Sequence, residues 1–248
     1  LTGTEAQTLY DQVIGRKDDE IETQFRNILG TTNGDYLFQG LQNTREMTVL
    51  LDMAYNGGAG LIGPKLVNAM WNGNRAEAWF EMRYNSNEGA SRGPGIAKRR
   101  FLESEFFGLY EDPEGAGVDA EEAKQIYRML QNHRNKIMQE EALFGISFDG
   151  TRGTWLDRNG RTALEAANQD YPVVRDYLDD GIVDTLEENL NTAKFALLAD
   201  LRVRHPEIAD KLTDAIVSTN IYLNPAKPTD TDQRSILDAR DYETGNYE

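Results

Sequence analysis

Apolar residues recur at intervals of three and four positions through most of this chain, and that spacing constrains its fold more than any other feature. One helical turn takes about 3.6 residues, so this spacing places apolar side chains on one face of a helix. Residues 64–71 are typical, because Leu66, Val67 and Met70 fall on one face behind a first-turn proline. One short stretch, 221–223, has the composition of a strand. The sequence therefore predicts an all-α, that is mainly α, protein.

Capping and turn residues divide this pattern into separate helices. Thr4 is the expected N-cap of the first helix. One face of that helix carries Ala6, Leu9, Tyr10 and Val13. The polar cluster at 31–35 is typical of a turn. Further helices are expected at 17–29, 45–57, 64–71, 75–84, 96–110, 120–144, 161–168, 173–179 and 182–203, with one more from Pro206.

The segment Asp112–Gly117 has the proline and glycine content of a linker or sharp turn. It separates a helical region at 1–111 from a second helical domain or extension at 119–223. Residues 224–248 are polar and contain two prolines, so we interpret them as an extended tail. Because the first residue is leucine, we expect the chain to be a processed or excised part of a larger parent chain that can carry further domains.

Charge and composition exclude several kinds of partner and site. The chain has 26 basic and 42 acidic residues, for a net charge of −16. Nucleic acid and anionic membranes need a basic face, so neither is expected as a partner. The absence of cysteine excludes disulfides and thiolate zinc sites, and the presence of only two histidines excludes a three-histidine metal site. No apolar run approaches the roughly 20 residues that span a bilayer.

Four segments in the first 110 residues resemble, in order, parts of one known family. They read LTGTEAQTLYDQVI at 1–14, LLDMAYNGGAG at 50–60, NAMWNGNRAEAWFEMRYN at 68–85 and GIAKRRFLESEFF at 95–107. Their order and spacing are similar to the C-terminal lobe of the phage-type lysozymes, which are muramidases of the glycoside hydrolase class with pesticin-like relatives. The resemblance implies a lysozyme-like helical lobe at 1–111, followed by the second helical domain.

The resemblance also implies a substrate cleft, faced by Tyr55 and Asn56 at one helix end and by Arg83 and Tyr84 at another. An aromatic ring can stack on a sugar, and an amide offers both a donor and an acceptor. The implied partner is peptidoglycan or a related glycan. The implied parent is a muramidase that hydrolyses the β-1,4 bond between N-acetylmuramic acid and N-acetylglucosamine. The residues alone leave a structural role open, in which these side chains complete the core, end a helix or cover apolar surface.

Muramidase chemistry needs a glutamic acid with a raised pKa and a second group, an aspartate or a threonine–aspartate arrangement. In the relatives these groups precede this lobe, so we assign no catalytic residue and leave open whether this chain is an enzyme. The acidic run at 18–22 and the pair Glu103 and Glu105 are interpreted as solvated helix faces. The basic run Lys98–Arg100 is interpreted as a salt-bridging face, with contact to acidic peptidoglycan stems as the alternative.

The segment Asp157–Gly160 is similar to a calcium loop, but the EF-hand spacing fails, since Trp155 and Ala166 would fill its first and twelfth positions. We interpret the segment as a structural turn. The alternative is a weak calcium site at which three oxygen-bearing side chains converge, namely Asp149, Asp157 and Asn159. A hard cation would suit this acidic, histidine-poor composition. No other cofactor is expected.

Two classes of function follow from these observations. One is a peptidoglycan-associated, lysozyme-like module of a muramidase parent. The other is a non-catalytic glycan-binding, structural or assembly domain of a larger secreted or phage protein. The acidic, cysteine-free composition is similar to parts of large secreted calcium-binding proteins of Gram-negative bacteria. A secreted, extracellular or periplasm-directed location is therefore expected.

Overall fold

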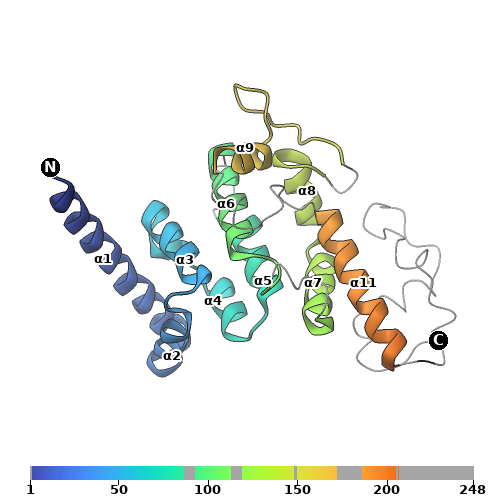
Figure 1. The fold of residues 1–248 in the computed structure, drawn as a ribbon, viewed down its shortest axis with the longest axis horizontal. Coiled ribbons are helices and arrows are strands. Elements are labelled where there is room, and N and C mark those ends of the chain that lie inside the picture. Colours follow the sequence, from blue (N-terminus) through green and yellow to red (C-terminus); the bar gives the residue numbers. More distant parts are fainter. Residues whose placement is uncertain are drawn as a thin grey trace. The chain divides into compact units, whose positions relative to one another are not determined.

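The computed structural model describes residues 2–86, 93–112, 119–147, 150–171, 186–204 and 206. These ranges are built from helices joined by loops and contain no named strand, so the predicted all-α fold is confirmed (Figure 1). The chain divides into two compact units. Unit 1 comprises Leu1–Asn74 and Ala78–Gly108, and unit 2 comprises Arg75–Glu77 and Leu109–Glu248.

Unit 1 is a set of helices around one apolar core. Its elements are α1 (Gly3–Leu29), α2 (Thr31–Leu41), α3 (Arg45–Gly57), the 3-10 turn η1 (Ala59–Leu61), α4 (Pro64–Trp71), the C-terminal part of α5 (Arg75–Phe80), the π-helical turn η2 (Glu81–Asn85) and α6 (Pro94–Phe107). Helix α1 packs against α2, α3 and α4, and α3 packs against α6. The fully buried core includes Ile21, Phe25, Leu50, Met53, Val67 and Phe101.

The helices that start at Arg45, Pro64, Arg75 and Ala120 agree with the sequence, whereas the separate helix predicted at 17–29 is part of α1. The Thr44 hydroxyl accepts a hydrogen bond from the Met47 amide at 3.2 Å, and Pro64 occupies the first turn of α4. The predicted cap Thr4 is wrong. Helix α1 begins two residues earlier, where Thr2 and Glu5 form a reciprocal capping box that satisfies two backbone donors at once.

The turn predicted at 31–35 is also wrong, because these residues open helix α2. Gly34 faces the backbone of α1, where a Cβ atom would lie 2.6 Å from the Arg26 nitrogen and 2.8 Å from the Phe25 carbonyl carbon. The glycine therefore permits two helices to approach closely, rather than a reversal of the chain. The Arg26 guanidinium also donates to Asp35 and, at 2.9 Å, to Glu22.

Unit 2 contains α7 (Ala120–Asn132), α8 (Arg134–Phe144), α9 (Ala163–Asp170) and α11 (Leu186–Arg204), and α7 packs against α11. The single helix predicted over 120–144 is wrong, because the chain breaks at His133 with φ −108°. His133 Nε2 lies 2.7 Å from Glu77 Oε1, and this long-range contact accompanies the break. Between α8 and α9, one antiparallel bridge joins Ile146 and Arg152.

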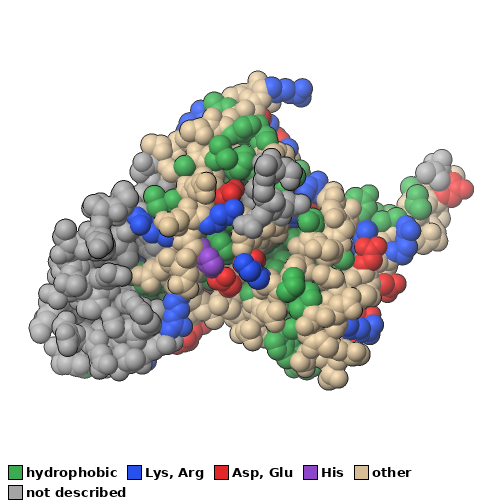
Figure 2. Space-filling model, turned by 180° about the vertical axis from the view of Figure 1, so that it is seen from behind, with side chains coloured by type: hydrophobic (Ala, Val, Ile, Leu, Met, Phe, Trp, Pro, Cys, Tyr) green, Lys and Arg blue, Asp and Glu red, His purple; other side chains and the backbone are tan. Residues whose placement is uncertain are grey.

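Several predicted elements lie outside the described residues. They are most of the linker at 112–117, the helix at 173–179, the start of the helix at 182–203, the short strand at 221–223 and the tail at 224–248. Within the described ranges, no helix is both long enough and apolar enough to cross a bilayer. Figure 2 shows acidic and basic side chains interspersed on one face, so the negative net charge is not gathered there into one acidic patch.

Candidate functional site

The four side chains expected to face a glycan lie in two different environments. Tyr55 and Asn56 are exposed near the C-terminal end of α3, and the Tyr55 side chain is 57% exposed. Arg83 and Tyr84 are fully buried in the π-helical turn that follows α5. A ligand in solvent can reach the first pair and not the second, so the structure does not bring the four together on one surface.

Arg83 is instead the centre of a closed cluster in the core, which we call the Arg83 cluster. Its guanidinium carbon lies 4.8 Å from the ring centre of Trp79 and 4.3 Å from that of Phe101. Its Nη1 donates to Ser104 Oγ at 2.9 Å and pairs with Glu105. Aromatic faces and a carboxylate both stabilise a desolvated guanidinium, so Arg83 is held on every side by attractive contacts.

The prediction that Glu103 and Glu105 belong to a solvated face is wrong. Their residues are 2% and 9% exposed, respectively. Helix α6 buries apolar and charged residues on several sides, so no polar face separates from an apolar one along its length. Each of the two glutamates instead has an arginine partner, Arg100 for Glu103 and Arg83 for Glu105.

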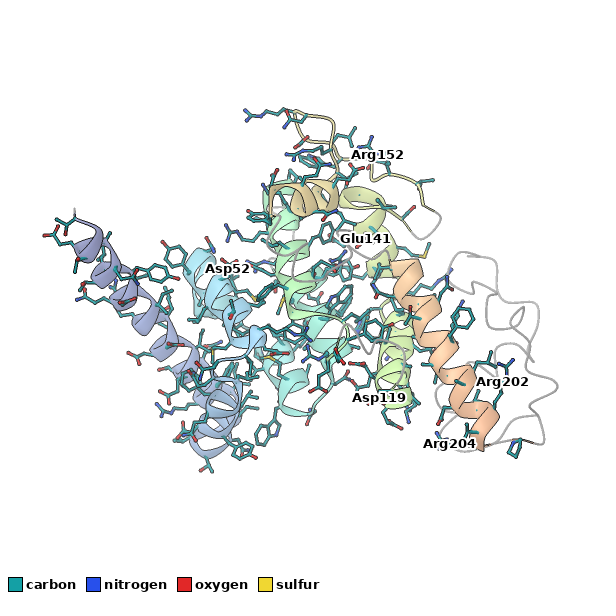
Figure 3. All side chains as sticks on the ribbon, in the orientation of Figure 1. Asp52, Asp119, Glu141, Arg152, Arg202 and Arg204 are labelled. Atoms are coloured by element: carbon teal, nitrogen blue, oxygen red, sulfur yellow. The ribbon has the colours of Figure 1, made fainter. Side chains whose placement is uncertain are left out.

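A second charged cluster links α3 to α6, and we call it the Asp52 cluster. Arg99 Nη1 donates to both carboxylate oxygens of Asp52 at 3.1 and 3.2 Å. The Asn56 amide nitrogen donates to Asp52 Oδ1 at 2.9 Å and to the Asp52 carbonyl at 2.8 Å. Asp52, which extends from α3 in Figure 3, therefore fixes both the arginine and the amide. Its own side chain remains 41% exposed, so solvent and solutes reach this cluster.

Glu103 forms the buried end of the Asp52 cluster. Burial raises the pKa of Glu103 to about 8, the Asp52 carboxylate adds to that rise, and the Arg100 and Arg99 guanidinium groups oppose it. Glu103 Oε2 accepts from Arg100, whereas Oε1 is buried and, while Glu103 is ionised, has no hydrogen bond in the described part of the chain. The protonated carboxyl can donate to Asp52, which is one cause of the raised pKa. The raised pKa favours the protonated form of Glu103 at neutral pH, even with Arg100 beside it.

The Asp157 carboxylate is held within its own turn. It accepts from the backbone amides of Asn159 and Arg161 at 2.8 and 2.9 Å, and from the Arg161 guanidinium at 2.8 and 3.0 Å. These hydrogen bonds lower its pKa, although partial desolvation acts in the opposite direction. Asp149 lies outside the described residues. Across the described ranges, no three His, Asp or Glu side chains gather as a metal site would require.

Sequence reasoning missed the Asp52 cluster because its members are far apart in the chain. Forty-seven positions separate Asp52 from Arg99, and nothing in the segments 50–60 and 95–107 that contain them indicates that the two side chains meet. The basic run Lys98–Arg100 was the one available signal, and two of its members do form salt bridges. Comparison of the chain with protein-family models, with curated proteins and with solved structures finds no match.

Proposed function

We propose that unit 1 is a glycan-binding module whose ligand is peptidoglycan or a related N-acetylated glycan. The observation that carries the proposal is the exposed Tyr55 ring beside an Asn56 amide that Asp52 holds in one orientation. An immobilised amide can bind an acetamide or hydroxyl group without first losing side-chain entropy. The neighbouring aromatic ring offers a flat surface for the apolar face of a sugar.

The surroundings of Asn56 and Asp52 bear on this ligand class. Gly57 and Gly58 follow Asn56 directly, and the Leu61 side chain packs against Gly57, so η1 closes this end of α3. The Asp52 and Arg99 side chains are 41% and 32% exposed, and each offers polar atoms to sugar hydroxyls. The amide, the carboxylate and the guanidinium contact one another across α3 and α6, and the exposed Tyr55 ring belongs to the same last turns of α3.

Binding is tested by titrating the full chain with chitotetraose and following backbone amide shifts by NMR, together with co-sedimentation with insoluble peptidoglycan. We expect Tyr55→Ala to weaken binding about fivefold, because one aromatic contact contributes about 1 kcal/mol. Tyr36→Ala is the matched control, since Tyr36 is also an exposed tyrosine of unit 1, at 73%. Equal losses for the two variants, or no shifts at millimolar sugar, would refute the proposal.

Hydrolysis of the glycan is a second candidate, and the Asp52–Glu103 pair is the observation that favours it. A glycoside hydrolase uses one protonated and one ionised carboxyl group, and the raised pKa of Glu103 supplies the protonated one. The acid must, however, touch the glycosidic oxygen, and Glu103 is only 2% exposed. We therefore expect binding without clearing in a peptidoglycan turbidity assay. Clearing that Glu103→Gln abolishes would instead establish the hydrolase.

A further inference from the structure

The apolar stripe of α1 continues beyond the core of unit 1. Its C-terminal half is buried through Ile21 and Phe25. The N-terminal half of the same helix runs clear of the other unit 1 helices in Figure 1, and there Leu9 is 50% and Tyr10 58% exposed. Figure 2 shows hydrophobic side chains exposed along this projecting part. Residues 3–12, about three turns of this helix, are thus exposed, and Val13 and Ile14 that follow are half-buried.

A pair of opposite charges flanks this bare stripe. Glu5 and Arg16 are eleven positions apart, which is close to three helical turns, so both lie on the same side of α1, next to Leu9. Along the helix axis they are separated by about 16 Å. The midpoint between them falls between Tyr10 and Asp11, in the middle of the exposed part. The acidic end and the basic end are therefore arranged symmetrically about that midpoint.

This arrangement is complementary to itself. When two such helices lie antiparallel and share that midpoint, Glu5 of each faces Arg16 of the other, and two intermolecular ion pairs form at once. Leu9 of each helix then meets the region of Val13 in the other, which closes an apolar seam. A parallel pair would place like charges opposite each other. The two helices are then related by a two-fold axis, so the same surface of each chain forms the interface, as in most protein dimers.

We propose that the exposed face of α1 binds a second copy of this chain, in an antiparallel helix pair centred between Tyr10 and Asp11. The positions of Glu5 and Arg16 indicate a second copy as the partner, because an antiparallel copy of the same helix forms the Glu5–Arg16 ion pair twice. About three helical turns bury less than the roughly 1,200 Å² of a standard interface, so we expect a weak dimer that dissociates within the range of 5 to 500 µM. This proposal is independent of glycan binding at α3.

Sedimentation equilibrium of the full chain between 5 and 500 µM tests the proposal. We expect a monomer–dimer equilibrium for the natural chain and a monomer throughout for Leu9→Glu, whose side chain is exposed, so the fold is retained. Arg16→Glu places two carboxylates opposite each other and should weaken dimerisation at least tenfold. Arg158→Glu changes the net charge equally at an exposed position in unit 2 and should leave dimerisation unchanged within twofold.

Mixing two variants tests whether the charges of residues 5 and 16 form the intermolecular ion pairs. Arg16→Glu and Glu5→Arg chains should each be monomeric, because each repels its own copy. Their equimolar mixture should dimerise with an affinity within threefold of that of the natural chain, because every facing pair is then opposite in charge. A monomeric natural chain at 500 µM, a dimer that persists in Leu9→Glu, or a mixture that stays monomeric would each overturn the proposal. None of these results depends on whether chitotetraose binds.

Discussion

The two arginine–carboxylate clusters of unit 1 differ in how completely their polar groups are paired. In the Arg83 cluster, aromatic rings, Ser104 and Glu105 surround a buried guanidinium. In the Asp52 cluster, one carboxylate is partly exposed and, while Glu103 is ionised, one of its buried oxygens has no hydrogen bond in the described part of the chain. A fully paired cluster stabilises one state of the protein. An incompletely paired one can change protonation, so only the second is suited to a functional response.

The largest expected effect is a pH dependence that arises in the Asp52 cluster. The pKa of Glu103 is about 8 in the folded chain, against an ordinary value of 4.5. The folded state therefore holds a proton that the unfolded chain releases, and the free energy of unfolding should fall as pH rises from about 5 to 8. At about 1.4 kcal/mol per pH unit, the fall is at most on the order of 5 kcal/mol. Urea denaturation at each pH measures it.

Glu103→Gln is the matched test of that pH dependence, because an amide of the same shape does not titrate. The fall between pH 5 and 8 should largely disappear in this variant. Burial also raises the pKa of Asp18 and Glu122, so these groups leave a smaller fall in Glu103→Gln, whereas carboxyls with lowered pKa, such as Asp157, act at lower pH. An unchanged slope in Glu103→Gln would assign the pH dependence to another group.

The next largest effect is a difference between Arg83 and Arg99, the arginines of the two clusters, in how much stability their replacement costs. Arg83→Met leaves the Glu105 carboxylate buried without its guanidinium, so we expect a loss of about 3–5 kcal/mol in the free energy of unfolding. The matched substitution Arg99→Met breaks a pair exposed to solvent and should cost about 0.2–1 kcal/mol. Equal losses in the free energy of unfolding, measured by urea denaturation, would contradict the view that one cluster is closed and the other open to solvent.

The smallest effect concerns Asp52 itself. Asp52→Asn removes the negative charge that adds to the raised pKa of Glu103, while burial, which is the largest cause, remains. The midpoint of the pH-dependent loss of stability should therefore move down by less than about one pH unit. Carbon-13 NMR of the glutamate carboxyl groups follows this titration directly. A midpoint that returns to the ordinary range of a glutamate would show that the neighbouring charge, and not burial, controls Glu103.

The sequence by itself determined the helical class and the starts of α3, α4, α5 and α7. Thr44 and Asp119 are N-caps, and Pro64 occupies a first turn, because capping and backbone restriction act within a few residues of each other. The family resemblance, rather than local reasoning, singled out Tyr55 and Asn56 at a helix end, and the structure leaves both exposed. The sequence could not show that Asp52 fixes the Asn56 amide in the company of an arginine 47 positions away.

Only the tertiary structure decided which polar residues are buried. A turn-like segment became α2 because Gly34 allows contact with α1, and a predicted continuous helix breaks where His133 meets Glu77. Nothing in the sequence distinguished the buried charges of Glu103 and Arg83 from solvated charges. The physical reason is that periodicity records the geometry of one helix, whereas burial, pKa and pairing depend on the helices packed against it.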